Sequence, residues 1–281
     1  MSNLNLRINQ GDIYGFIGRN GAGKSTALKM ICNLAKPTQG EVLFKGKSRK
    51  EMSDLKGRIG CLIETPGLLY NMTAYENLRA KCIYMGIKDK DYIGRLLEIV
   101  NLTDTGNKTA KNFSLGMKQR LGIALALVGD PDVLLLDEPI NGLDPQGIAE
   151  IRELILKLNR EENITIMVSS HILEELSKVA TRYGIIHNGE LIKELSHEEL
   201  TEQCSECILL ETADSNTAMP VLDRLGFSKY TAVDSKTIEI YERLDEIPVL
   251  ASSLASEGIP ISGISKKSES VEDYFLRLTS N

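Results

Sequence analysis

Residues Gly18 to Ser25 read G-R-N-G-A-G-K-S, a glycine-rich loop with the spacing of a phosphate-binding loop. Glycines let the backbone turn tightly, so that successive N–H groups face an anion. A buried strand over Asp12 to Ile17 is predicted before the loop and a helix over Ser25 to Leu34 after it, which puts phosphates at a helix N-terminus. Lys24 can reach the β- and γ-phosphates, and the Ser25 hydroxyl can ligate Mg²⁺. The predicted triphosphate site is Gly18, Arg19, Asn20, Gly21, Ala22, Gly23, Lys24, Ser25 and Thr26.

A second motif, V-L-L-L-D-E-P, runs from Val133 to Pro139. Its uninterrupted apolar run is typical of a parallel strand covered on both faces. Asp137 at the strand end is placed to hold Mg²⁺ through water, and Glu138 can polarise an attacking water. Adjacent carboxylates of this kind are what metal-assisted hydrolysis of a phosphoanhydride needs. Further motifs are F-S-L-G-M-K-Q-R at Phe113 to Arg120, N-G-L-D at Asn141 to Asp144, and a buried strand at Ile164 to Ser169 followed by His171.

These motifs, in this order, resemble the ATP-binding subunits of ABC transporters, and the resemblance runs from Leu6 to about Glu194. It implies ATP and Mg²⁺ as cofactors, with Glu138 as catalytic carboxylate, His171 as the residue that senses the γ-phosphate, and Lys24 on the phosphates. Metal contacts would come from Ser25, Asp137 and Glu64. The resemblance also implies a dimer, in which Ser114 and Gly116 touch ATP held by the opposite subunit while Leu143 and Asp144 lie at the seam.

The expected fold is an α/β P-loop ATPase core with a parallel sheet, an antiparallel β edge and an inserted helical subdomain, followed by a small α+β domain. The core is expected over residues 1–205, its helical part over about 70–128, and the small domain over 206–281. Predicted helices cover Thr73 to Met85 with a capping box, Asp89 to Val100, Ser114 to about Val128, Pro145 to Arg160, Thr217 to Leu225, Pro248 to Ser256 and Ser270 to Leu278. Predicted strands include Gly40 to Lys45, Arg58 to Ile63, Cys207 to Glu211, Tyr230 to Val233 and Thr237 to Tyr241.

The resemblance implies that a membrane permease is the partner and that the loop Ile63 to Tyr70 faces it. The subunit would form a homodimer or heterodimer, cytoplasmic and peripheral on the inner face of the membrane. No apolar run in the 281 residues approaches the length that spans a bilayer. The formal charge of -6 argues against a nucleic-acid partner.

Three features depart from the family pattern. Glu64 stands where most members carry Gln, and the signature reads F-S-L-G-M over Phe113 to Met117 in place of L-S-G-G-Q. Both variants are similar to those of bacitracin and lantibiotic exporters, which suggests export of an antimicrobial peptide or drug. Third, a first strand and an adenine-stacking aromatic residue are missing before Leu4, and Tyr14 lies in the wrong place to replace it. We expect the true start upstream or a truncated chain; a missing stack would weaken ATP binding by about 0.5–1.5 kcal/mol.

Two other functions stay open at this stage. The chain could be an ATP-binding regulatory subunit with weak hydrolysis, because of Glu64 and the altered signature. It could also be a soluble ABC ATPase without a transport role, although it has a single phosphate loop and no heptad run. Five scattered cysteines fit a reducing compartment, and Cys204 and Cys207 are read as ordinary thiols in preference to metal ligands.

Overall fold

The structure is a computed structural model that describes residues 1–48, 58–89, 91–204, 206–267 and 270–279. The chain forms two compact units, Met1–His197 and Glu198–Asn281. The sequence predicted the division after residue 205, which lies outside the described residues. Within the described ranges, none of the helices combines the length and apolar character that crossing a membrane requires.

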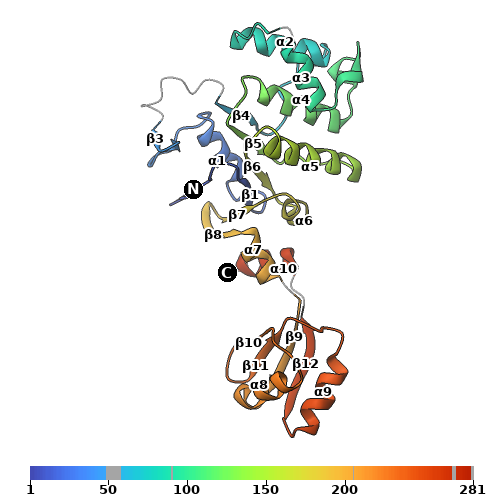
Figure 1. The fold of residues 1–281 in the computed structure, drawn as a ribbon. Coiled ribbons are helices and arrows are strands. Elements are labelled where there is room, and N and C mark those ends of the chain that lie inside the picture. The colour runs from blue at the N-terminus through green and yellow to red at the C-terminus, as the bar shows by residue number, and fades with distance from the viewer. Residues whose placement is uncertain (49–57, 90, 205, 268–269, 280–281) are drawn as a thin grey trace. The chain divides into compact units, whose positions relative to one another are not determined.

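A six-stranded sheet organises the first unit (Figure 1). Its strands are β1 (Ile13–Ile17), β4 (Ile59–Leu62), β5 (Val133–Asp137), β6 (Thr165–Ser170), β7 (Arg182–His187) and β8 (Glu190–Ser196). They are ordered β4-β5-β6-β1-β7-β8; neighbours run parallel from β4 to β7, and β8 pairs antiparallel with β7. The predicted parallel sheet with an antiparallel edge is therefore confirmed.

Helices cover both faces of this sheet because its central strands are apolar on both sides. They are α1 (Lys24–Ile31), α5 (Pro145–Arg160) and α6 (Leu173–Ser177). Tyr14 and Phe16 of β1 pack in one buried cluster with Leu28 of α1. Gly15 faces the other way, where a β-carbon would lie 2.7 Å from the side chain of Leu176 in α6. A larger residue at this position would therefore force the Leu176 side chain to move.

The predicted helical part of the first unit contains α2 (Ala74–Met85), α3 (Tyr92–Ile99) and α4 (Leu115–Leu127), with short 3₁₀ turns at Thr103–Thr105 and Ala110–Asn112. The three α-helices group together at one end of the unit (Figure 1). The predicted capping box of α2 is confirmed, since the Thr73 hydroxyl accepts from the Glu76 N–H and the Glu76 carboxylate accepts from the Thr73 N–H. The strand expected at Gly40 to Lys45 is shorter, a two-residue β2 (Leu43–Phe44) paired with β3 (Lys47–Ser48).

The second unit is a β-α-β-β-α-β fold with a four-stranded antiparallel sheet. Its elements are α7 (His197–Gln203), β9 (Cys207–Thr212), α8 (Ser215–Arg224), β10 (Tyr230–Ala232), β11 (Thr237–Ile240), α9 (Ile247–Ser256), β12 (Ile261–Lys267) and α10 (Val271–Thr279). The sheet order is β10-β11-β9-β12, and α8 and α9 share its apolar core. The sequence did not predict β12, because I-S-G-I-S-K-K places a glycine and two lysines in a short strand.

Candidate functional site

The phosphate loop lies where the theory of open α/β sheets places ligands, at the carboxyl ends of central parallel strands. It follows β1, whose neighbours are β6 and β7. Gly21 and Gly23 adopt positive φ values of 82° and 108°, which side chains disfavour, and α1 begins directly afterwards at Lys24. Gly18 is required for a different reason: a β-carbon there would lie 2.7 Å from the carbonyl oxygen of Ile186.

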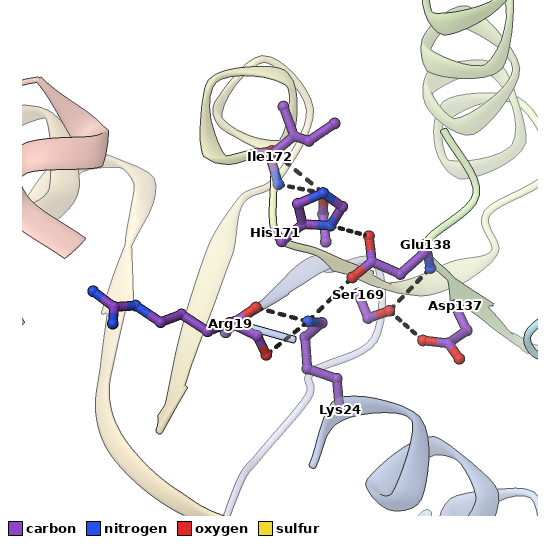
Figure 2. Close-up of polar contacts among 9 residues, drawn as sticks. Arg19, Lys24, Asp137, Glu138, Ser169, His171 and Ile172 are labelled. Carbon is purple, nitrogen blue, oxygen red and sulfur yellow. Dashed lines mark hydrogen bonds and ion pairs between the residues drawn. The ribbon is translucent and has the colours of Figure 1, made fainter. Parts of the chain in front are cut away.

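Lys24 is buried within the loop and already paired (Figure 2). Its Nζ donates to the carbonyl oxygen of Gly18 at 2.7 Å and to that of Arg19 at 3.3 Å. The same ammonium forms an ion pair of 3.1 Å with Oε1 of Glu138, at 5% and 20% side-chain exposure. The Arg19 side chain points away from this cluster (Figure 2). The loop therefore holds one buried cation whose partners can be exchanged for an anion.

Glu138 joins the phosphate loop to the end of β6. Its φ of 49° turns the chain directly after β5, and its N–H donates to the Ser169 hydroxyl at 3.0 Å. Its second carboxylate oxygen contacts Nδ1 of His171 at 2.7 Å, and His171 is 35% exposed. Figure 2 shows Lys24 and His171 on opposite oxygens of this carboxylate. The structure thus brings together three residues that the sequence predicted as a functional group.

Asp137 is buried at the last position of β5, at 2% exposure. Its Oδ1 accepts a 2.6 Å hydrogen bond from the hydroxyl of Ser169, the residue opposite it on β6. Sequence reasoning did not include Ser169 in the site, although the dipeptide Ser169-Ser170 at the end of a buried strand was a usable signal. Ser169 matters because its one hydroxyl orients Asp137 and also accepts from the Glu138 N–H.

The residues expected to meet a partner subunit lie together at a second place in the first unit. They are Ser114, Gly116, Leu143 and Asp144. Ser114 caps α4, and its hydroxyl accepts from the N–H of Met117 at 3.2 Å. Asp144 caps α5 in the same way, accepting from the N–H of Gly147 at 3.0 Å. A β-carbon on Gly116 would lie 3.9 Å from Leu143, so these two helix starts are neighbours. In the described part of the chain, the side chains of Ser114 and Asp144 make these local cap hydrogen bonds, neither of which reaches the phosphate loop.

Glu64 is an exposed member of the predicted set of metal ligands. It follows β4 with a φ of 61°, is 62% exposed, and pairs through Oε1 with Nζ of Lys29 on α1 at 2.5 Å. Ser25 and Thr26 stand in the first turn of α1. Sequence reasoning missed Lys29, because nothing in the local pattern links a helix residue to a strand end more than thirty positions later.

One further contact around the phosphate loop could be seen only in the structure. The turn between β7 and β8 touches it, because the Gly189 N–H donates to the carbonyl oxygen of Ala22 at 2.9 Å. Among the described residues, Cys204 and Cys207 form no disulfide, and Cys207 is buried in β9. Over the part of the chain that is described, no group of three or more His, Cys, Asp or Glu side chains could hold a metal ion alone.

The donor set nonetheless suits magnesium bound together with a nucleotide. Mg²⁺ prefers oxygen ligands and is usually held by one or two carboxylates plus substrate phosphates. Ser25 supplies a hydroxyl beside the phosphate loop, and Asp137 supplies a buried carboxylate oriented by Ser169. A phosphate loop, a strand-end carboxylate pair and a histidine directly after the neighbouring strand define the class of this protein as a P-loop nucleoside triphosphatase.

Comparison with known proteins defines the family more closely. The family model for ABC transporters matches residues 1–141. The bacitracin transport ATP-binding protein BcrA of Bacillus licheniformis is 41% identical over 99% of this chain and 92% of its own length. The lantibiotic transport ATP-binding protein SrtF of Streptococcus pyogenes is 42% identical over 75% of this chain and 92% of its own.

A solved structure similar to this chain is the dimeric post-hydrolysis state of the ATP-binding cassette MJ0796, bound to ADP and Pi. It has a TM-score of 0.62 and 29% identity, covering 69% of this chain and 89% of that one. The chain belongs to the ABC transporter family, in which it is an ATP-binding subunit and an ATPase.

Proposed function

We propose that two copies of this subunit, or one copy and a related subunit, hydrolyse ATP to drive export through a separate membrane permease. The observation that carries the catalytic part is the chain of contacts from Lys24 through Glu138 to His171, next to the Asp137–Ser169 pair. The similarity to BcrA and SrtF supports antimicrobial peptides or similar drugs as the exported class. In this proposal the subunit works on the cytoplasmic face of the membrane.

ATP binding should begin with an exchange of partners at Lys24. A buried ammonium needs a counter-charge, and in the structure Glu138 supplies it. The β- and γ-phosphates can take over that role, because the loop N–H groups and the start of α1 also favour an anion. The exchange frees the Glu138 carboxylate at the moment when the substrate arrives.

The freed Glu138 is then placed to accept a proton from the attacking water. His171 contacts its other oxygen and can hold the carboxylate in position or reach toward the γ-phosphate. Ser25 and Asp137, with Glu64 as a further candidate, would hold Mg²⁺, which supplies charge neutralisation on the phosphates. Ser169 keeps Asp137 oriented by donating its hydroxyl hydrogen.

The remaining stabilisation is proposed to come from the partner subunit. Ser114 and Gly116 start α4, so free N–H groups and a hydroxyl lie at an exposed helix N-terminus. Leu143 and Asp144 start the neighbouring α5 and would lie at the dimer seam. Because neither pair bonds to the phosphate loop of its own chain, we expect one chain alone to hydrolyse ATP poorly.

The permease would dock on the loop that follows β4 and on the start of α2. Four large apolar side chains there are between 40% and 49% exposed: Leu69, Tyr70, Met72 and Tyr75. Apolar side chains that gather on a surface commonly mark a protein interface. These residues follow Glu64 in the chain and run into α2, so a permease docked there can influence both.

The proposal is tested first by hydrolysis. Turnover per subunit should rise with protein concentration as dimers form, and Glu138→Gln should abolish turnover while an ATP-bound dimer accumulates in size-exclusion chromatography. Hydrolysis that is independent of concentration, or undiminished in Glu138→Gln, would contradict the catalytic assignment. Absence of any Mg²⁺-dependent hydrolysis by the wild type would favour the regulatory-subunit alternative.

The export part needs its own test. Cells that lack the transporter should gain resistance to bacitracin or to a lantibiotic when this chain and its permease are expressed together. A chain carrying Lys24→Ala serves as the matched control, because it should leave the permease present but without energy. Equal resistance with both chains would remove export from the proposal while leaving the ATPase assignment intact.

A further inference from the structure

One face of α1 points at the end of β4. Ser25, Lys29 and Cys32 are spaced i, i+4 and i+7, so they lie along a single stripe of the helix. The Lys29 ammonium pairs with Glu64 at 2.5 Å, and the Cys32 thiol is hydrogen-bonded to Cys61. Lys29 therefore contacts Glu64, shortly after β4, and Cys32 contacts Cys61 within β4.

The third member of the stripe is Ser25, one helical turn from Lys29 toward the phosphate loop. One turn is about 5.4 Å along the helix axis. The Glu64 carboxylate is held by Lys29, the residue that follows Ser25 by one turn on this stripe. If the Glu64 side chain left Lys29, its carboxylate would be available to a metal ion held at Ser25.

We propose that Lys29 is a positioning residue that holds the Glu64 carboxylate away from the metal site until Mg²⁺ and nucleotide are bound. This inference rests on the proposed function, because it takes Ser25 as a metal contact. Lys29 and the metal ion compete for one carboxylate. Lys29 also neutralises Glu64, which would otherwise add a negative charge close to the triphosphate.

The expected effect is modest because the pair is exposed, at 36% for Lys29 and 62% for Glu64. Exposed ion pairs are weak, so competition from Lys29 should reduce the coupling between Mg²⁺ and nucleotide by about two- to fivefold. Loss of any nearby cation would also favour Mg²⁺ by simple electrostatics. The decisive question is whether the effect of Lys29 passes through Glu64.

Isothermal titration calorimetry of the full chain with AMP-PNP answers it without turnover. The dissociation constant is measured with Mg²⁺ and with EDTA, and the ratio of the two values gives the coupling between metal and nucleotide. Lys29→Met should raise this coupling about two- to fivefold. Lys29→Arg, which can still pair with Glu64, should restore the wild-type value, and Lys36→Met is the control for loss of an exposed cation after α1.

The double variant decides the matter. In a Glu64→Gln background, Lys29→Met should leave the coupling unchanged, because no carboxylate remains to be released. An equal increase in both backgrounds, an increase with Lys36→Met, or no increase at all would overturn the role of Lys29. Failure of the wild type to bind AMP-PNP with Mg²⁺ would instead refute the nucleotide site itself, so the two failures are distinguishable.

Discussion

The ion pair between Lys24 and Glu138 gives the sharpest energetic prediction. At 3.1 Å the Coulomb attraction between the two groups is about 5 kcal/mol for an effective dielectric constant of 20. Desolvation of the buried ammonium offsets much of this attraction. Lys24 keeps two carbonyl acceptors, and a glutamine oxygen can still accept a hydrogen bond. We therefore expect Glu138→Gln to lower the free energy of unfolding of the nucleotide-free chain by about 1–3 kcal/mol.

The same substitution should tighten nucleotide binding, because ATP no longer has to displace a charged partner from Lys24. The affinity for ATP should rise by at least about fivefold, the equivalent of 1 kcal/mol. Differential scanning fluorimetry and calorimetric titration measure the two quantities, and the midpoint of nucleotide-free unfolding should fall by about 2–10 °C. Glu150→Gln is the matched control, since its 3.5 Å pair with Arg120 lies outside the site. A Glu138→Gln chain with unchanged nucleotide-free stability and unchanged ATP affinity would refute the exchange of partners.

Three further predictions follow from local geometry. Ser114→Ala removes the cap of α4 and should lower the free energy of unfolding by about 1 kcal/mol, whereas Ser114→Gly should lower it by only a few tenths of a kcal/mol. Both variants should lower turnover by more than about tenfold if the hydroxyl acts on the partner's ATP. Equal turnover of wild type and Ser114→Gly in a hydrolysis assay would exclude that role. Gly60→Ala places a β-carbon 2.1 Å from the backbone oxygen of Ala126 and should destabilise the fold by about 1–3 kcal/mol or more, while Gly94→Ala, with nothing within 4 Å, should stabilise α3. Chemical denaturation measures the free energy of unfolding of both variants, and similar values would contradict the close packing of Gly60 against Ala126. The hydrogen bond from Cys32 lowers the pKa of Cys61 to about 7, and burial raises that of Cys82. Because the thiolate is the nucleophile, alkylation of Cys61 by iodoacetamide should accelerate as the pH rises through about 7, and peptide mapping should show it ahead of Cys82.

Local chemistry explains what could be predicted. The helix α5 has the bounds read from the sequence, because Asp144 caps it, Pro145 suits its first turn and its apolar spacing is regular. The capping box at Thr73 was predicted for the same reason, since its partners are only three residues apart. The strand β12 was missed because its composition is weak, and its pairing with β9 decides its structure.

By itself, the sequence determined the phosphate loop and the two strand-end carboxylates, because each is a contiguous motif whose chemistry requires its residue types. The order of these and the three further motifs determined the family. Only the tertiary structure placed Ser169 between Asp137 and the Glu138 N–H, and only it joined Lys29 to Glu64. Those contacts connect residues more than thirty positions apart, so they depend on strand order and helix orientation. The packing of β1, β5 and β6 side by side is what turns separate motifs into one site.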